Sequence, residues 1–483
     1  MSHKIQFSPQ QLAFFDWCKN GTGSCVLEAV AGAGKSTALI NAIKLFQGQV
    51  ALLAYNKKIA DELKEKLLEA GIDWKKGQAG TVHSFGFSAF RKAFGNVTVE
   101  SKKVYHILDK EYDELHPLSI WKQTIAHLVS LAKQCAVGIE HTIEDTSLWH
   151  NIAEHHDVFN GPDENEPRPP KEEIIEAAKA TLKINNRIVN VIDFDDMVYL
   201  PLVHRVRFWQ FDVVMVDEAQ DTNAARRALV RALVKKGGRV VAVGDRHQAI
   251  YGFTGADNDS LDLIGKDFNC SYMPLTVTFR CPKSVVDFSK QWVSHIEAAA
   301  TAPEGSVSSI MLEELFTRED LTGASAVLCR NTKPLVQLAF SLIRRKIACR
   351  VEGRDIGNGL IKMITKQKTR LLAQKKEIKL QQLEDQIETI KVIIDQCLSE
   401  GKANVSDAVD HIERMFDDEV RGVLVLSTIH KSKGREWKNA FWLDRAGTCP
   451  SKWARQAWQA AQERNLMYVA ATRAKQNLIE VLV

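Results

Sequence analysis

The sequence lacks the cysteine pairs, long apolar runs and charge imbalance that mark several classes of protein. Its nine cysteines are scattered without a CxxC pair, which argues against a zinc knuckle or a disulfide framework. No run approaches eighteen apolar residues, and the opening residues MSHKIQFSPQ lack the apolar core of a signal peptide. The 64 basic and 60 acidic side chains nearly balance, so composition neither requires nor excludes a nucleic-acid partner. We therefore expect a protein of the reducing cytoplasm without a membrane partner.

Short apolar runs that end in glycine or acidic turns recur along the chain, and such runs are typical of buried parallel strands. In the first part of the chain they cover residues 25–30, 49–55, 211–216 and 239–243. In the second part they cover residues 326–329, 423–427, 440–443 and 478–483. Helix-like stretches lie between these runs. The pattern predicts the α/β class, with two parallel sheets whose strands divide near residue 275.

Two segments have helical patterns instead. Residues from about 90 to 190 are expected to be helical, interrupted at residues 160–170 by prolines and acidic residues. Residues from about 356 to 416 form a second helical stretch, whose apolar residues recur every three to five positions. Its first half is rich in lysine. A solvated helix face and a contact with nucleic-acid phosphates both explain that charge.

A strand, a loop of small residues and a helix follow one another near the N-terminus, through the sequence AVAGAGKST at residues 29–37. Small residues let backbone N–H groups surround phosphate oxygens, and the helix N-terminus adds partial positive charge. We expect Lys35 to neutralise the β- and γ-phosphates of ATP and the Ser36 hydroxyl to ligate Mg²⁺. The other residues expected at the nucleotide are Ala31, Gly32, Ala33, Gly34 and Thr37. Ala29 stands where the general pattern has a glycine.

The second half of an ATPase site follows another apolar strand, where residues 211–216 lead into the sequence DEAQD. Two adjacent carboxylates beside a phosphate loop suit Mg²⁺ binding by Asp217 and activation of water by Glu218. For this motif by itself, a solvated acidic turn is the alternative. Together with the phosphate loop it predicts a site that hydrolyses ATP with Mg²⁺.

At DEAQD the chain begins to resemble the UvrD/Rep/PcrA-like helicases of superfamily 1A, and in detail their compact F-box and phage-type branch. The motifs that carry the resemblance occur in order: FSPQQ from residue 7, YNK from 55, TVHSF from 81, VIDFDD from 191, VGDRHQAIYGF from 243, LTVTFRCP from 275, STIHKSKGREW from 427 and RNLMYVAATRAK from 464. The resemblance implies two RecA-like domains.

The resemblance also implies roles around the nucleotide. It places three groups at the γ-phosphate: Gln248, Arg280 and Arg473. It places four more at the base and ribose: Gln11, Phe279, Gly434 and Glu436. Both arginines come from the second sheet domain, so domain closure would complete the site, and ATP binding would select the closed state. An arginine supplied in this way contributes on the order of 10³–10⁵ in rate.

Seven residues are expected at DNA by the same resemblance: Tyr55, Asn56, His83, Phe85, Tyr251, Phe253 and His430. Each base stacked on an aromatic ring contributes about 1–3 kcal/mol to binding. For each aromatic residue taken separately, a place in the core is the alternative. Thr254 follows Phe253, whereas the family usually has arginine after tryptophan there, so one phosphate contact is missing.

The expected domains are a first RecA-like domain (1–90 and 190–274), a helical insertion (91–189), a second RecA-like domain (275–355 and 417–483) and a reduced arm (356–416) in place of the 2B subdomain. The predicted function is an ATP-dependent DNA helicase that moves 3′ to 5′ along single-stranded DNA and separates strands. A translocase that strips proteins or powers a partner without unwinding is the alternative, while intact catalytic residues disfavour a non-catalytic scaffold.

The expected partners are single-stranded DNA and junctions of single- and double-stranded DNA; a protein partner is compatible with the sequence, which does not identify one. The expected location is the cytoplasm, at the nucleoid or at sites of DNA replication and repair, or the host cytoplasm if a phage encodes the chain.

Overall fold

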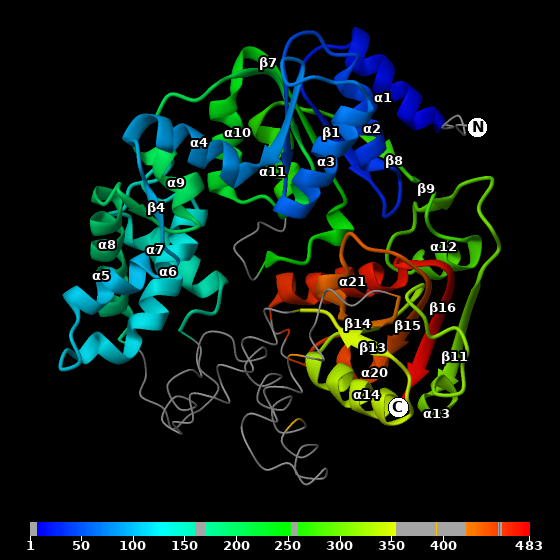
Figure 1. The fold of residues 1–483 in the computed structure, drawn as a ribbon. Coiled ribbons are helices and arrows are strands. Elements are labelled where there is room, and N and C mark those ends of the chain that lie inside the picture. The colour runs from blue at the N-terminus through cyan, green and yellow to red at the C-terminus, as the bar shows by residue number, and fades with distance from the viewer. Residues whose placement is uncertain are drawn as a thin grey trace. The chain divides into compact units, whose positions relative to one another are not determined.

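The computed structural model describes residues 7–159, 170–252, 259–353, 393, 413, 422–452, 454 and 456–483. The chain divides into two compact units, one made of residues 1–29 and 34–275 and the other of residues 30–33 and 276–483. Each unit holds one six-stranded sheet covered by helices (Figure 1). The predicted α/β class with two parallel sheets is confirmed.

The sheet of the first unit has the order β3-β2-β6-β7-β1-β8, and all its pairs are parallel. Its strands are β1 (Cys25–Ala29), β2 (Val50–Ala54), β3 (Gly77–Thr81), β6 (Phe211–Val216), β7 (Val234–Gly244) and β8 (Ser271–Leu275). The apolar runs became strands because parallel strands covered by helices must be apolar on both faces. Since all strands run the same way, the segments after β1, β2, β3, β6 and β7 emerge at one edge of the sheet.

Seven helices of this unit accompany the sheet: α1 (Pro9–Asn20), α2 (Lys35–Ile43), α3 (Lys57–Glu69), α4 (Val82–Phe94), α9 (Asp196–Val203), α10 (Ala224–Leu233) and α11 (Ser260–Asp267). Side chains cap several of them. Asn56 caps α3, Thr81 caps α4 and Asn223 caps α10, each by accepting a backbone N–H of the first turn. These caps fix where each helix begins after its strand or turn.

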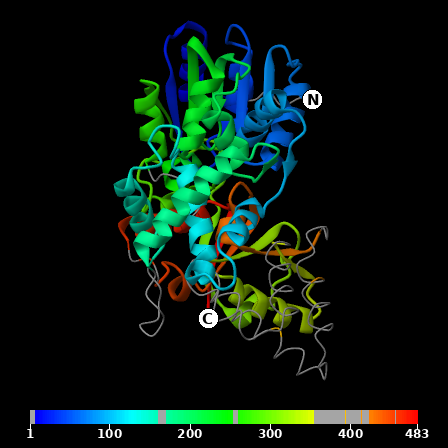
Figure 2. The same cartoon turned by 90° about the vertical axis from the view of Figure 1, so that its left-hand side faces the viewer.

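The expected helical region between residues 90 and 190 is a helical bundle, seen in Figure 1 and again after a quarter turn in Figure 2. Its helices are α5 (Lys103–Glu111), α6 (Lys122–Gln134), α7 (Thr146–His155) and α8 (Lys171–Arg187). They enclose an apolar core that includes the fully buried Trp149. A short parallel pair that the sequence did not predict, β4 (Thr98–Val99) with β5 (Val191–Ile192), joins the segments that enter and leave the bundle.

A buried ionic cluster lies where the chain leaves this bundle. Lys133 Nζ is 2.5 Å from Asp193 Oδ2 and 2.8 Å from Asp196 Oδ1, and Lys103 Nζ is 2.7 Å from Asp196 Oδ2. Asn185 donates its side-chain amide to Asp196. Buried charges require such partners, so the cluster holds α5, α6 and α8 against the segment that returns to the sheet.

The sheet of the second unit has the order β11-β16-β15-β12-β14-β13 and is also parallel throughout. Its strands are β11 (Ser306–Met311), β12 (Ser325–Cys329), β13 (Cys349–Val351), β14 (Leu424–Thr428), β15 (Trp437–Leu443) and β16 (Ala474–Leu482). A separate pair joins β9 (Val277–Thr278) to β10 (Glu297–Ala298). The helices described in this unit are α12 (Lys283–Ser289), α13 (Leu312–Leu315), α14 (Thr332–Arg344), α19 (Ile429–Ser432), α20 (Arg445–Thr448) and α21 (Ala457–Ala471).

Within the two six-stranded sheets, four strands escaped the sequence pattern, namely β3, β8, β11 and β13. Strand β3 has the sequence GQAGT and β11 the sequence SVSSIM. Both lie at an edge of their sheet, where one side needs no continuous apolar run. Other predictions fall outside the described residues: the loop at 160–169, the arm at 356–416 apart from residues 393 and 413, and Phe253.

Candidate nucleotide site and nucleic-acid interface

The phosphate loop leaves β1 and enters α2 through two glycines in the left-handed region. Gly32 has φ 74° and Gly34 has φ 75°, values that only glycine adopts without strain. Gly34 is the N-cap of α2 and supplies no side-chain cap. The first turn, Lys35 to Thr37, therefore presents backbone N–H groups of the kind that bind phosphate oxygens. Ala31 and Ala33 are buried.

Lys35 lies against the second motif. Its Nζ is 3.1 Å from Glu218 Oε2. Burial alone would lower the pKa of Lys35, but the carboxylates of Glu218, Asp217 and Asp245 outweigh it and raise the pKa above its ordinary value. Lys35 is thus a cation at any physiological pH. Glu218 has φ 51°, an uncommon conformation for a residue with a side chain.

Asp217 directly follows strand β6 and is buried. Burial, and next the charge of Glu218, raise the pKa of Asp217 to about 6. Asp217 supplies a buried carboxylate and Ser36, which follows Lys35 in the chain, supplies a hydroxyl; Mg²⁺ prefers such oxygen donors, with substrate phosphates completing the coordination. The described residues therefore fit ATP with Mg²⁺.

Hydrogen bonds lead from Glu218 to Gln248. Gln220 donates its amide to Glu218 Oε2 at 2.5 Å, and its own Oε1 accepts the backbone N–H of Asp245 at 3.0 Å. Gln248 then donates to Asp245 Oδ2 at 2.7 Å. A Cβ on Gly244 would lie 2.5 Å from Gln220 Oε1, so the backbone approach here requires glycine. The structure thus links the predicted Lys35, Glu218 and Gln248 through two residues that the sequence reading left out.

Gln220 and Asp245 were missed although both lie within recognised motifs. Local sequence does not reveal their connection, because the two residues bond to each other across 25 positions of the chain. Gln11 shows the opposite case. Its Oε1 accepts the backbone N–H of Ser8 at 2.9 Å, and its N–H donates to Ser8 Oγ at 3.1 Å, which forms a capping box on α1. The residue expected to read adenine therefore also fixes the start of a helix.

In the second unit, Glu436 pairs with two cations: Arg280, which the sequence predicted for the site, and Lys475. Its carboxylate lies 2.6 Å from Arg280 Nε and 3.0 Å from Lys475 Nζ. Burial alone would raise the pKa of Glu436, but these cations lower it below its ordinary value. Phe279 is 47% exposed beside them, as a ring that receives a ligand would be. Gly434, with φ 82°, permits the turn before Glu436.

Arg473 is fully buried within the second unit. Its Nε donates to the Val469 carbonyl at 2.8 Å and its Nη1 to the Arg435 carbonyl at 3.1 Å. His430 is half-buried, and desolvation, together with the charges of Arg330 and Lys433, holds its pKa well below the ordinary value. The hydrogen bonds of Arg473 join the end of α21 to the segment before β15.

Two aromatic pairs stand at the carboxyl edge of the first sheet. Tyr55 stacks on Tyr251 with 5.5 Å between ring centroids and 12° between planes, and the Arg226 guanidinium lies 5.0 Å from the Tyr55 centroid. His83 stacks on Phe194 at 4.1 Å and 28°. Each pair joins residues far apart in the sequence. Tyr55 follows β2 and Tyr251 follows β7, while His83 follows β3 and Phe194 follows β5.

Phe194 is a further residue that sequence reasoning missed. It is 59% exposed while its partner His83 is buried. Burial, and next the charge of Arg226, lower the pKa of His83 to about 3, so its ring is neutral at physiological pH. A phenylalanine between acidic residues, in VIDFDD, was a signal for an exposed aromatic side chain. Phe85 instead packs edge-on against Phe211 of the sheet, as a core aromatic residue does.

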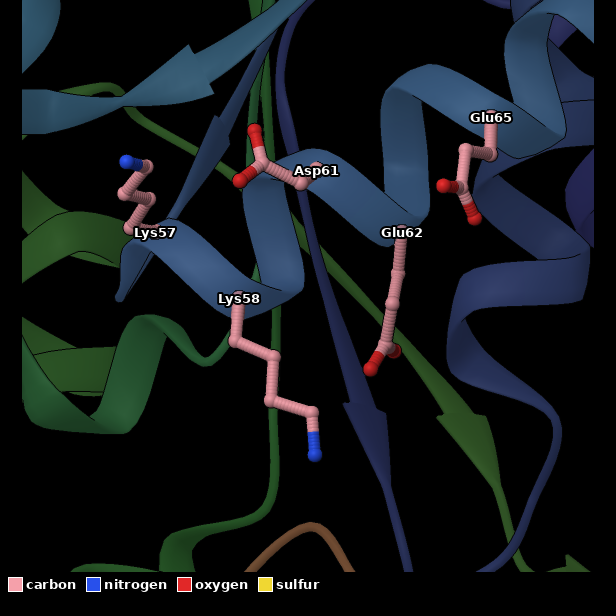
Figure 3. A pocket seen from close by; sticks show the side chains of 5 residues that line it. All are labelled: Lys57, Lys58, Asp61, Glu62 and Glu65. Carbon is pink, nitrogen blue, oxygen red and sulfur yellow. The ribbon is translucent and has the colours of Figure 1, made fainter. Parts of the chain in front are cut away.

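The first turns of α3, which follow Tyr55 and Asn56, border a pocket of about 520 Å³. Figure 3 shows the side chains that line it, all from this helix: Lys57, Lys58, Asp61, Glu62 and Glu65. Two lysines occupy the first turn and three carboxylates the turns after it. The charge along this face of α3 therefore changes from positive in the first turn to negative in the turns after it.

Among the described residues, none of the helices is both long and apolar enough to cross a membrane. The same residues contain no group of three or more histidines, cysteines or carboxylates arranged to hold a metal ion. His150 of the bundle instead lies 3.1 Å from Glu172.

Two regions of the chain match known protein families. Residues 12–269 match the UvrD/REP helicase N-terminal domain, and residues 350–482 match the UvrD-like helicase C-terminal domain. The chain is 27% identical over 264 residues to the ATP-dependent DNA helicase Rep of Escherichia coli (strain K12), which covers 51% of this chain and 37% of that protein. It is 24% identical over 307 residues to the probable DNA helicase II homolog of Mycoplasma pneumoniae, a match that covers 59% of this chain and 42% of that protein. It is 26% identical over 206 residues to the ATP-dependent DNA helicase PcrA of Leuconostoc citreum, which covers 39% of this chain and 27% of that protein.

The matched region thus spans less than half the length of these relatives. With the N-terminal match alone extending over more than half of the sequence, the chain belongs to the UvrD/REP helicase family.

Proposed function

We propose that this chain is an ATP-dependent motor that moves 3′ to 5′ along single-stranded DNA and separates the strands of a duplex. One observation carries the proposal: the hydrogen-bonded series from Lys35 to Gln248 ends three residues before Tyr251, whose ring stacks on Tyr55. A nucleotide site and a stacking platform thus share one edge of one sheet. The relatives named as DNA helicases support the same choice.

The chemistry follows from the groups at the phosphate loop. Lys35 and the N–H groups of α2 would bind the phosphates, and Ser36 and Asp217 would hold Mg²⁺, which neutralises charge that develops on the phosphates. Lys35 now pairs with Glu218. When Lys35 turns to a phosphate, Glu218 loses that partner and can orient the attacking water. Substrate binding thereby activates the base.

Movement would arise from the connection to Gln248. A change in the γ-phosphate would shift Gln248, then Asp245 and Gln220, and the segment that carries Tyr251 would follow. We assign residues 1–90 and 190–274 to the first RecA-like domain, 275–355 and 417–483 to the second, 91–189 to the insertion and 356–416 to a reduced arm. Closure of the domains would bring Arg280 to the γ-phosphate. Glu436 would then release Arg280 and bind the ribose instead.

The aromatic pairs suit a sequence-independent track. Stacking on Tyr55 or Phe194 accepts any base because every base has a π-face. His83 stacks under Phe194 as a neutral ring, so it adds no charge to this surface. The neighbouring lysines of α3 supply phosphate contacts.

The test is ATP hydrolysis measured with and without single-stranded DNA. We expect DNA to stimulate the wild type, and Lys35→Ala to abolish turnover while its circular dichroism still shows a folded protein. Lys64→Ala, at an exposed lysine of α3, is the matched control and should retain turnover. Hydrolysis that does not respond to single-stranded DNA would contradict the proposal.

A second pair of assays separates unwinding from movement without unwinding. Duplexes with 3′ or 5′ tails report strand displacement and its polarity, while a streptavidin block on a single strand reports translocation. Displacement of the strand on 3′-tailed duplexes supports the helicase. Displacement of streptavidin alone would replace it by a translocase that strips proteins.

A further inference from the structure

We propose that the exposed face of α4 forms a groove that binds the phosphodiester backbone of DNA, so that the DNA interface extends beyond the aromatic pairs. The inference rests on the proposed function and adds a surface to it. The groove has a volume of about 460 Å³. The described residues that line it are Ser84, Phe87, Ser88, Arg91, Lys92, Gly95 and Asn96.

These residues form one face because they recur at intervals of three and four along a helix. Helix α4 has 13 residues, and its length is therefore about 20 Å. The opposite face is fixed against α9 and the bundle. Phe90 is fully buried there, and a Cβ on Gly86 would stand 2.1 Å from the Met197 carbonyl oxygen. The groove therefore lies on a helix that cannot rotate or withdraw.

The charge of this face is positive. Between Asp73 and Glu100 the sequence contains no acidic residue, and Arg91 and Lys92 are both exposed. Within the described parts of the chain, neither of them is within ion-pair distance of a carboxylate. By contrast, Lys122 of the same unit is paired with Asp109 at 2.6 Å. Two exposed cations without a carboxylate partner among the described residues attract a polyanion.

The groove suits phosphates rather than bases. The Arg91 guanidinium lies over the Phe87 ring at 5.7 Å from its centroid, so a cation covers that ring face. The remaining lining groups are hydroxyls, an amide and Lys92, which position a backbone without reading or stacking bases. The contrast with Phe194, whose ring is largely exposed, is direct.

The groove also continues from the aromatic pair. Ser84, its first lining residue, follows His83, which stacks on Phe194. The hydroxyl of Thr81 accepts the Ser84 N–H at 3.0 Å and sets the start of α4. A strand whose base stacks on Phe194 can therefore run on along α4 past Arg91.

The experiment compares the double variant Arg91→Gln/Lys92→Gln with the control Lys19→Gln/Lys236→Gln. The control removes two exposed lysines that lie before β1 and in the first part of β7, on the side of the sheet away from the nucleotide. Fluorescence anisotropy with a single-stranded oligonucleotide and with a tailed duplex gives the dissociation constant across a series of salt concentrations. The melting temperature and DNA-free ATP hydrolysis establish that each variant folds.

Each lost contact lowers the slope of log K against log salt by about 0.7 on single strands and 0.9 on duplex. We expect the groove variant to lose about 1.4 on the single strand, or about 1.8 if its contacts are to duplex, and the control to keep the wild-type slope. Should the double variant fold poorly, Lys92→Gln alone should give half the change. An equal loss on both DNAs assigns the groove to the single strand, and a loss confined to the tailed DNA assigns it to the duplex.

A groove variant with the slope of the control on both DNAs overturns the inference. That result differs from failure of the proposed function. Wild-type ATP hydrolysis that ignores DNA contradicts the function, whatever the variant does. Stimulation of the wild type together with an unchanged slope contradicts only the groove.

Discussion

Lys133 offers a direct test of how the helical bundle is joined to the first sheet. Its side chain is 1% exposed and pairs with Asp193 at 2.5 Å and Asp196 at 2.8 Å. Burial alone would lower the pKa of Lys133, but Asp196, Asp193 and Asp195 outweigh it and raise the pKa above its ordinary value. The charged lysine is therefore bound to carboxylates that would otherwise be desolvated without compensation.

Lys133→Met keeps much of the side-chain volume and removes the charge. Asp196 would retain Lys103 at 2.7 Å, whereas Asp193 would lose its only ion pair among the described residues. Removing one partner of a buried pair costs about 3–5 kcal/mol because an uncompensated charge remains. We expect the free energy of unfolding to fall by that amount, and Lys133→Met/Asp193→Asn to recover much of it.

Urea unfolding followed by circular dichroism and tryptophan fluorescence measures the effect, with Trp149 buried in the bundle as a reporter. The matched control is Lys64→Met. Its pair with Asp61 is about half exposed on both sides, and such pairs contribute only about 0.2–1 kcal/mol. A loss below about 1 kcal/mol for Lys133→Met, comparable with this control, would refute the idea that paired charges hold the bundle exit.

Three further outcomes are expected. Because the pKa of His83 is lowered from 6.5 to about 3, the unfolded chain takes up a proton that the folded chain does not, and stability present above pH 6.5 is lost as the pH falls toward 3. Urea titrations should show that His83→Gln removes about 1.4 kcal/mol per pH unit of this slope within that window, and identical slopes would contradict the burial argument. Gly86→Ala should destabilise by about 1–3 kcal/mol in thermal or urea unfolding, since its Cβ would stand 2.1 Å from the Met197 carbonyl oxygen, although the same change on an exposed helix stabilises. Phe194→Ala should weaken binding of single-stranded DNA roughly 5- to 150-fold by anisotropy, whereas Trp74→Ala, another exposed aromatic, should not; equal effects would remove Phe194 from the interface.

Local patterns predicted the sheets because their causes are local. An apolar run such as residues 211–216 must be buried on both faces, and a loop of small residues before a helix can bind phosphate wherever it occurs. Strand β6 therefore has the predicted bounds. Strand β3 was missed because an edge strand beside one neighbour does not need such a run.

The sequence by itself determined the α/β class and the order of the motifs, and it predicted Lys35, Asp217 and Glu218 for the ATP site that we propose. Only the tertiary structure decided that Phe194 stacks on His83, that Gln220 connects Glu218 to Asp245, and that Arg91 and Lys92 share an open groove. The physical reason is that sheet order and helix packing bring together segments far apart in the chain. A residue's sequence shows its chemistry, but its neighbours depend on which strands and helices become adjacent in the fold.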